Sequence, residues 1–215
     1  MKSESHISYH IPLTTTCAEE TIKRSRFIVQ ITHTPDIQAA KIFIAKIRSQ
    51  HASANNNCWA YVAGAPMSSH VLGFSDDGEP AGTAGKPMLN VLMGSDIGEI
   101  TAVVTRYFGG IKLGTGGLMR AYSGSLKRSM QEIKTIEKIP VSVIYTKSEY
   151  AYQTTIDQVL KEFNTLDVKR RFTDHISWIV KMDSRVLEAF IDNVFDRTNG
   201  QVKFEQEGIK PPAQK

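Results

Sequence analysis

Glycine is concentrated in one part of the chain. Twelve of the 15 glycines lie between Gly73 and Gly124. A glycine weakens a helix or strand, because its unfolded backbone has more freedom to lose than that of any other residue. A dense cluster therefore indicates tight turns with positive φ, or a backbone that another group approaches closely. The charged residues interleaved with these glycines favour the second explanation. They are Asp76, Asp77, Glu79, Lys86, Arg106, Lys112 and Arg120.

The composition predicts a globular protein without covalent or metal staples. Of the 215 residues, 41% are hydrophobic, which is enough to build a core. Cys17 and Cys58 are the only cysteines, and their spacing predicts neither a disulfide framework nor a cysteine-based zinc site. The six histidines are scattered without metal-type spacing. No apolar run reaches the roughly 20 residues of a membrane span, and the N-terminus lacks the apolar stretch of a signal peptide. We therefore expect a cytoplasmic protein with no membrane partner.

The net charge of +4 is unevenly distributed. Residues 1–138 hold 15 Lys and Arg against 11 Asp and Glu, whereas residues 139–215 hold 11 of each. The excess positive charge mildly favours an anionic partner for the first part, but a solvated surface is the simpler explanation for an imbalance of this size.

The first part of the chain predicts a mixture of strands and helices. Strands are expected over 14–23, 27–32, 58–62, 71–74 and 97–106. The near-continuous apolar run of the last one predicts a central strand that is buried on both faces. Helices are expected over 35–50, 88–93 and 118–136, from apolar residues at helical spacing.

The pattern changes after Lys138. Strands are expected over 140–147, 165–172, 175–182 and 201–205, and helices over 151–163 and from Ser184 to about 198. The order βαββαβ over about 70 residues is the ferredoxin-like signature. We therefore predict an α+β protein with two domains, 1–138 and 139–208, followed by a disordered tail over 209–215.

The second glycine-rich loop leads into a predicted helix. The backbone N–H groups at a helix start are unpaired, and the helix dipole adds positive partial charge. Gly114, Gly116 and Gly117 let an anion approach this backbone, and Lys112 and Arg120 add side-chain charge. The loop is neither a Walker A loop nor a Rossmann fingerprint, and a tight strand-to-helix turn explains the glycines equally well.

Three carboxylates, Asp76, Asp77 and Glu79, lie within four residues. They could hold Mg²⁺, act as a general base, pair with basic residues of the loops, or form a turn around Gly78. The structural roles are favoured, because loop metal sites usually combine more ligand types. The candidate ion-pair partners are Arg106, Lys112 and Arg120. We expect no metal, no cofactor and no catalytic residue, since the loop hydroxyls have no local histidine to activate them.

Further basic residues extend the candidate anion-binding surface beyond the loops. The full set is Lys23, Arg24, Arg26, Lys86, Arg106, Lys112 and Arg120, together with the backbone of Gly114, Gly116 and Gly117. Tyr107 and Phe108 adjoin the loop, and an exposed ring there could stack on a base.

Two long motifs resemble those of the YigZ/IMPACT family. They are Asp76-Asp-Gly-Glu-Pro-Ala-Gly-Thr-Ala-Gly-Lys-Pro87, and Val104-Thr-Arg-Tyr-Phe-Gly-Gly-Ile-Lys-Leu-Gly-Thr-Gly-Gly-Leu118 with Arg120-Ala-Tyr122. The resemblance covers nearly the whole chain, and its two-part layout is similar to the bacterial members. Family members often carry a histidine just before the position of Cys58, where this chain has Asn57. Any role of that histidine would be absent here.

The resemblance implies a first domain like the second domain of certain ribosomal proteins, and a second domain like the ferredoxin-like last domain of elongation factor G. It also implies a role in regulating translation, as in eukaryotic members. We therefore expect a non-enzymatic binding protein whose partner is RNA, the ribosome or a translation-related protein. The alternatives are an enzyme acting on a phosphate-containing small molecule at the loops, and a protein–protein module that uses the loops as its contact surface.

Overall fold

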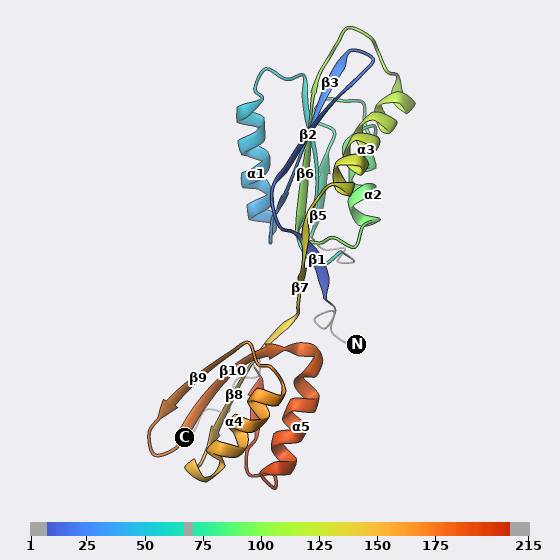
Figure 1. Ribbon diagram of the computed structural model, residues 1–215. Helices are drawn as coiled ribbons and strands as arrows, with labels where there is room; N and C mark the ends of the chain where they lie inside the picture. Colours follow the sequence, from blue (N-terminus) through green and yellow to red (C-terminus); the bar gives the residue numbers. More distant parts are fainter. Residues whose placement is uncertain (1–7, 67–70, 207–215) are drawn as a thin grey trace. The chain divides into compact units, whose positions relative to one another are not determined.

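The chain folds into two compact units. The structure is a computed structural model that describes residues 8–66 and 71–206. The first unit runs from Tyr9 to Lys138, and the second begins at Ile139 and also contains Ser8. The described residues contain strands and five α-helices, which confirms the mixed α and β composition (Figure 1). The predicted tail over 209–215 lies outside the described residues.

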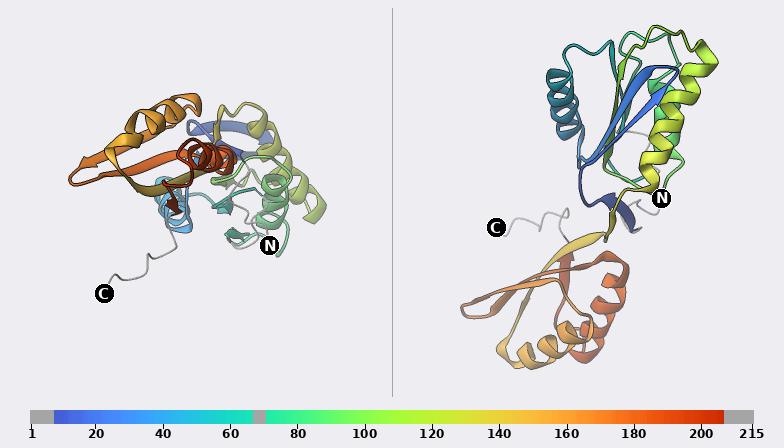
Figure 2. Two further views of the ribbon diagram at one scale, coloured as in Figure 1. Left: turned by 90° about the horizontal axis from the view of Figure 1, so that it is seen from below. Right: turned by 45° about the horizontal axis from the view of Figure 1, so that its top comes forward.

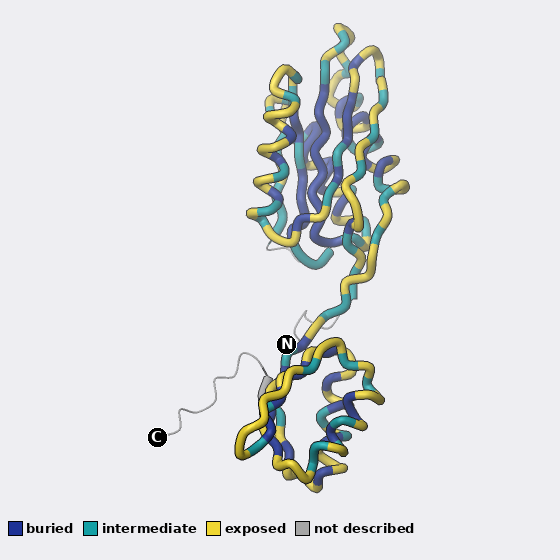
Figure 3. The backbone as a smooth tube through the Cα atoms, turned by 60° about the vertical axis from the view of Figure 1, so that its left-hand side comes forward, coloured by how far each residue is buried: buried dark blue, intermediate teal, exposed yellow. Residues whose placement is uncertain are grey.

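A five-stranded antiparallel sheet forms the centre of the first unit, in the order β2-β3-β6-β4-β5. Its strands are β2 (Thr16–Ile22), β3 (Ser25–His33), β4 (Asn56–Val62), β5 (Leu72–Ser75) and β6 (Ile100–Tyr107). The helices are α1 (Ile37–Gln50), α2 (Gly85–Met93) and α3 (Thr115–Gln131). Strand β6 is the middle strand and is buried over nearly all its length, as its apolar run predicted (Figure 3).

Helices cover both faces of this sheet (Figure 1). Helix α1 lies on one face, where its Ala40 and Ile44 pack with Tyr61 and Val103. Helices α2 and α3 lie on the other face. The core beneath them includes Met88 of α2. Residues on alternate sides of β4 and β6 therefore enter two different cores, as the two-residue period of a strand requires.

A two-stranded ribbon closes the first unit. Strand β1 (Tyr9–Pro12) pairs antiparallel with β7 (Thr135–Lys138). The prediction of a helix over 118–136 was wrong at its end, because α3 stops at Gln131 and the chain enters β7. Strand β1 was not predicted. Each strand is four residues long. Each forms only by pairing with the other, which lies at the opposite end of the unit's sequence.

A buried carboxylate fastens this ribbon to the sheet. The Glu99 side chain is only 5% exposed and has an unusual φ of +51°. It accepts hydrogen bonds from the Tyr9 hydroxyl (2.9 Å) and from Lys138, and it pairs with His33 Nε2 at 2.7 Å. Burial alone raises the pKa of Glu99, but Lys138, His33 and Tyr9 outweigh it and lower the pKa below its ordinary value of 4.5.

We expect Glu99 to make the first unit sensitive to acid. Because its folded-state pKa is depressed, its contribution to stability is complete above pH 4.5 and is lost as the pH falls through the folded pKa. The Glu99→Gln variant should be less stable than wild type at neutral pH and should lose less stability between about pH 5 and pH 3. Thermal unfolding across this range, with exposed Glu132→Gln as the control, measures the effect. Parallel curves for wild type and Glu99→Gln would contradict this assignment.

The second unit has a four-stranded antiparallel sheet in the order β11-β8-β10-β9. Its elements are β8 (Val141–Ser148), α4 (Gln153–Glu162), β9 (Asp167–Phe172), β10 (Ile176–Asp183), α5 (Leu187–Arg197) and β11 (Phe204–Gln206). The predicted βαββαβ order is therefore present. The helix expected from Ser184 begins later, because Asp183 accepts a hydrogen bond from Arg185 N–H and caps a 3-10 turn (Ser184–Val186) that precedes α5.

Both helices of the second unit lie on one face of its sheet (Figures 1 and 2). Trp178 and Met182 of β10 pack there with Ile156 of α4 and Phe190 of α5. Within the described residues of this unit, the opposite face of the sheet carries no helix. Over residues 8–66 and 71–206, no helix has the length and apolar character needed to cross a membrane.

We propose that residues 1–138 and 139–208 are domains that fold independently. Limited proteolysis should cut the exposed segment around Lys138 and release two folded fragments of about 138 and 70 residues. Circular dichroism of the purified fragments would measure their folding. Loss of structure in both fragments after cleavage would contradict the proposal.

Candidate functional site

Asp76 organises the first glycine-rich loop as a helix cap. Its Oδ2 accepts a hydrogen bond from Gly82 N–H at 2.9 Å, and its Oδ1 accepts from Ala84 N–H (2.9 Å) and Gly85 N–H (2.8 Å). These donors lie at the start of α2, which has no cap from its own N-cap residue, Ala84. Burial alone raises the pKa of Asp76, but the three N–H donors lower it overall. A residue nine positions upstream thus supplies the cap that a helix start needs.

Asp77 holds the same loop against α1 and β4. Its Oδ1 accepts from Arg48 Nη2 at 2.6 Å, and its Oδ2 accepts from Asn57 N–H at 2.7 Å. Its backbone has a positive φ of +42°, and Asn56 Nδ2 donates to its carbonyl. Asp77 does pair with a basic residue, but this is Arg48 rather than one of the loop residues considered from the sequence.

Glu79 forms a buried ion pair with Arg106 beneath the loops. Arg106 Nη1 donates to Glu79 Oε1 at 2.6 Å, and the side chains are only 7% and 6% exposed. The Tyr122 hydroxyl donates to the same oxygen at 2.8 Å. Arg106 is one of the three ion-pair partners that the sequence suggested for the acidic motif. The ion pair takes Arg106 out of the exposed basic set and gives it a structural position below the surface.

Cys58 and Tyr122 are buried beside this pair. Burial raises the pKa of both groups far above their ordinary values, and the nearby carboxylates raise them further. The Cys58 thiol donates to the Asp76 carbonyl at 2.9 Å. A protonated, buried thiol is a poor nucleophile, so the structure gives Cys58 no reactive character.

The β2–β3 hairpin brings two basic residues to the second glycine-rich loop. Lys23 and Arg24 form its two-residue turn, with positive φ values of +44° and +64°. Gly109 lies directly against this turn, since an added Cβ would be 1.9 Å from the Arg24 carbonyl oxygen. Ser25 Oγ accepts from Gly109 N–H at 3.2 Å. The hairpin tip and the loop before α3 therefore lie together at one end of the sheet (Figure 1).

The start of α3 is open. Its N-cap is Gly114 with φ +71°, it has no side-chain cap, and its first turn contains no acidic residue. The Arg120 guanidinium lies over this turn, because an added Cβ on Gly116 would be 3.6 Å from its Nη1. The unpaired N–H groups, the positive end of the helix dipole and the Arg120 guanidinium therefore all place positive charge at the first turn of α3.

The other predicted basic residues are at the surface. Exposed are Lys23, Arg24, Arg26, Lys86, Lys112 and Arg120. Arg26 is 3.8 Å from Glu19 and stacks on the Tyr107 ring. Within residues 8–66 and 71–206, the other five make no ion pair. Phe108 is 44% exposed, with the Arg106 guanidinium 5.3 Å from its ring centroid, whereas Tyr107 is half-buried.

Sequence reasoning did not find the residues that orient the carboxylates. Arg48, Asn57 and Tyr122 come from three different elements, so no local spacing relates them to residues 76–79. The only local signal was Asn57, a polar residue within an apolar strand. It is buried, and its Oδ1 accepts from Thr105 at 2.7 Å.

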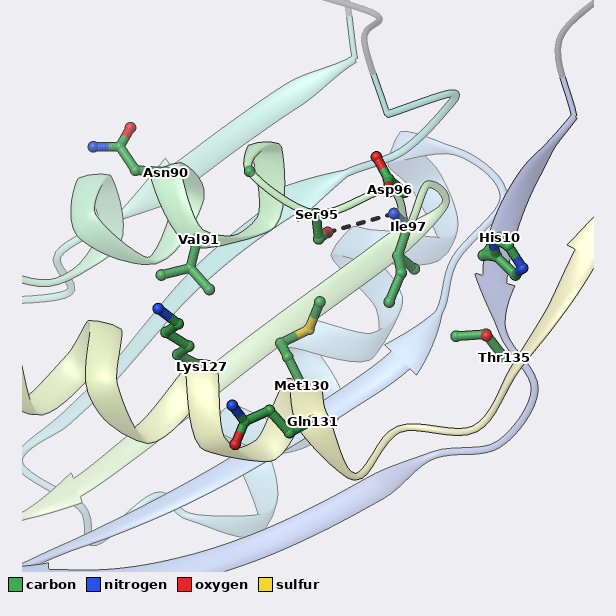
Figure 4. A pocket seen from close by; sticks show the side chains of 11 residues that line it. His10, Asn90, Val91, Ser95, Asp96, Ile97, Lys127, Met130, Gln131 and Thr135 are labelled. Atoms are coloured by element: carbon green, nitrogen blue, oxygen red, sulfur yellow. Dashed lines mark hydrogen bonds between the residues drawn. The ribbon is translucent and has the colours of Figure 1, made fainter.

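A separate groove of about 600 Å³ lies at the other end of α2 and α3 (Figure 4). Apolar residues such as Val91, Ile97 and Met130 line it together with polar residues such as His10 and Lys127. None of the residues predicted for the anion-binding surface lines this groove.

Comparison with known proteins agrees with the motifs. The model of the Impact N-terminal domain matches residues 23–130. An IMPACT family member of Haemophilus influenzae is 41% identical over 90% of this chain and 94% of its own length. IMPACT family member YigZ of Escherichia coli is 42% identical over 91% of this chain and 96% of its own length. IMPACT family member YvyE of Bacillus subtilis is 38% identical over 85% and 83%.

A solved structure is also similar over most of the chain. The crystal structure of a hypothetical protein aligns with a TM-score of 0.68 and 41% identity, over 92% of this chain and 96% of that one. The matched segment 23–130 contains the hairpin tip, both glycine-rich loops and the buried Glu79–Arg106 pair. This chain therefore belongs to the IMPACT family.

Proposed function

We propose that the protein is a non-enzymatic, translation-associated regulator that binds RNA through the glycine-rich end of its first unit. This surface consists of the hairpin tip (Lys23 and Arg24), Lys112 and Arg120, and the open start of α3. Cytoplasmic location, and likeness of the two units to a ribosomal-protein domain and to the last domain of elongation factor G, are parts of the same proposal.

One observation carries the proposal. Four exposed basic side chains, unpaired within the described residues, lie on the hairpin tip, in the adjoining loop and in α3, whose start has no side-chain cap and no acid in its first turn. Phosphate groups bind at such helix starts, and most protein–nucleic acid hydrogen bonds are made to the phosphate backbone. Phe108 beside them offers a ring on which a base can stack.

The acidic motif does not offset this positive charge at the surface. Asp76 is directed to backbone N–H groups, Asp77 to Arg48 and Glu79 to Arg106. Each carboxylate thus has an internal partner, which favours a supporting role for the motif. The same contacts weaken the alternative of a phosphate-processing enzyme, because a general base or a magnesium ligand would have to leave its present partners.

The test is a titration of the whole protein with single-stranded RNA, duplex RNA and purified ribosomes at about 50 mM and about 200 mM salt. Affinity for at least one of them should fall steeply with salt. Arg24→Glu and Lys112→Glu should each weaken binding and lower the slope of log K against log salt by about one. Both residues are exposed, so unfolding curves should stay unchanged.

Lys46→Glu is the matched control, because Lys46 is exposed on α1 of the same unit and the charge change is identical. It should bind like wild type. Salt-insensitive binding, or equal losses in Lys46→Glu and Lys112→Glu, would contradict the proposal.

A further inference from the structure

The helix-free face of the second unit's sheet has an ordered set of exposed side chains. Side chains alternate between the two faces along each strand. On β10, Trp178 and Val180 enter the core, so Ile179 and Lys181 belong to the open face. Ile179 is 39% exposed, and Tyr145 on the neighbouring strand β8 is 36% exposed.

The strand register places these residues in rows. Tyr145, Ile179 and Lys169 are direct neighbours across β8, β10 and β9. In the next row, Lys147 and Arg171 flank Ser177. At the strand spacing of about 4.8 Å, each three-strand row spans roughly 10 Å. In this register Tyr145 is flanked by Ile179 of β10 and by Glu205 of β11, while Lys147 lies two residues along the same strand and Lys169 lies on the far side of β10.

Basic residues outnumber acidic ones in these rows. Lys147, Lys169, Arg171 and Lys181 are all exposed, and within the described residues none makes an ion pair. Two acids belong to these rows by register, namely Asp167 opposite Lys181 and Glu205 opposite Tyr145. Four cations against two acids leave these rows with a positive balance, which complements a polyanion better than another basic surface.

We propose that this face is a second binding surface, which takes single-stranded nucleic acid. Tyr145 and Ile179 contact one or two bases, and Lys147, Lys169, Arg171 and Lys181 contact the phosphates. A four-stranded sheet that stacks bases on aromatic side chains of its open face is an effective geometry for single strands, since every base has a π-face. A duplex hides its bases and cannot use Tyr145. This surface is independent of the proposed RNA-binding surface on the first unit.

The experiment uses the full chain and fluorescence anisotropy with oligouridine RNA and oligothymidine DNA of about 16 nucleotides, beside a duplex. Tyr145→Ala should weaken single-strand binding by about 5- to 150-fold, which is the range for loss of one stacked base. Tyr145→Phe should bind like wild type. If Tyr145→Ala unfolds at a lower temperature than wild type, Tyr145→Leu replaces it. Leucine keeps the bulk of the side chain and removes the aromatic ring, so the same loss of single-strand binding is expected.

Lys169→Glu tests the phosphate contacts, with Lys161→Glu as the control because Lys161 is exposed on α4, at the helix-covered face. Of these two variants, only Lys169→Glu should weaken single-strand binding and lower the slope of log K against log salt. All variants are measured again in an Arg24→Glu/Lys112→Glu background. If second-unit variants weaken binding in both backgrounds, the inference stands whatever happens to the first surface. Absence of single-strand binding, wild-type affinity in Tyr145→Ala, or equal losses in Lys169→Glu and Lys161→Glu would overturn it.

Discussion

Replacing Glu79 by glutamine should lower the free energy of unfolding of the first unit by about 3 to 5 kcal/mol. The substitution keeps the shape of the side chain and removes its charge. The Arg106 guanidinium then remains buried without a counter-charge, and the Tyr122 hydroxyl loses a charged acceptor. Amide hydrogen exchange of β6 measures the loss, while exchange of β10 in the second unit serves as the internal reference.

Glu19→Gln is the matched control for this prediction. Glu19 lies 3.8 Å from Arg26, and both side chains are about half exposed, so the change should cost no more than about 1 kcal/mol. The Glu79→Leu/Arg106→Met double variant should recover much of the loss, because it leaves no unpaired charge. A cost for Glu79→Gln as small as that of Glu19→Gln would show that the pair does not hold the loops.

Gly109→Ala should destabilise the first unit by about 1 to 3 kcal/mol and displace the hairpin tip. The added Cβ would lie 1.9 Å from the Arg24 carbonyl oxygen, a backbone atom that cannot rotate away. The turn at Lys23 and Arg24 must therefore move as a unit. Hydrogen exchange of β2 and β3 should increase, and binding to RNA should weaken together with it.

Gly116→Ala is the corresponding control. An added Cβ there meets only the far end of the Arg120 side chain at 3.6 Å, and alanine favours helix over glycine. This variant should lose no stability. If Gly109→Ala were as stable as Gly116→Ala, the close approach of the loop to the hairpin would be refuted.

Local patterns predicted those elements whose burial repeats along the chain. Ala40, Ile44 and Ile47 recur at helical spacing, and all three are buried in α1 as expected. The apolar run of β6 correctly predicted a central strand. Strands β1 and β7 escaped prediction because each is short and is specified by the other, as in the pairing of Tyr9 with Lys138. Pairings this distant leave no periodic trace in either segment.

In the candidate site, too, local sequence features were predicted and contacts between distant residues were missed. Glycines and charges marked both loops, and the Glu79–Arg106 pair was among the interpretations of the acidic motif. The cap that Asp76 provides was missed, because it spans nine residues instead of the three of a capping box. The pairing of Asp77 with Arg48 joins a loop to the last turn of α1. Such contacts exist only once the sheet has aligned their elements.

The turn at Lys23 and Arg24 has a consequence for engineering. Two-residue hairpin turns with positive φ at both positions strongly prefer Asn-Gly, because side chains are disfavoured there. This chain places two long cationic residues in that conformation and so gives up stability that a neutral turn would supply. A thermostabilised variant with Lys23→Asn and Arg24→Gly is therefore easy to design, but it would gain its stability by discarding two charges of the proposed RNA-binding surface.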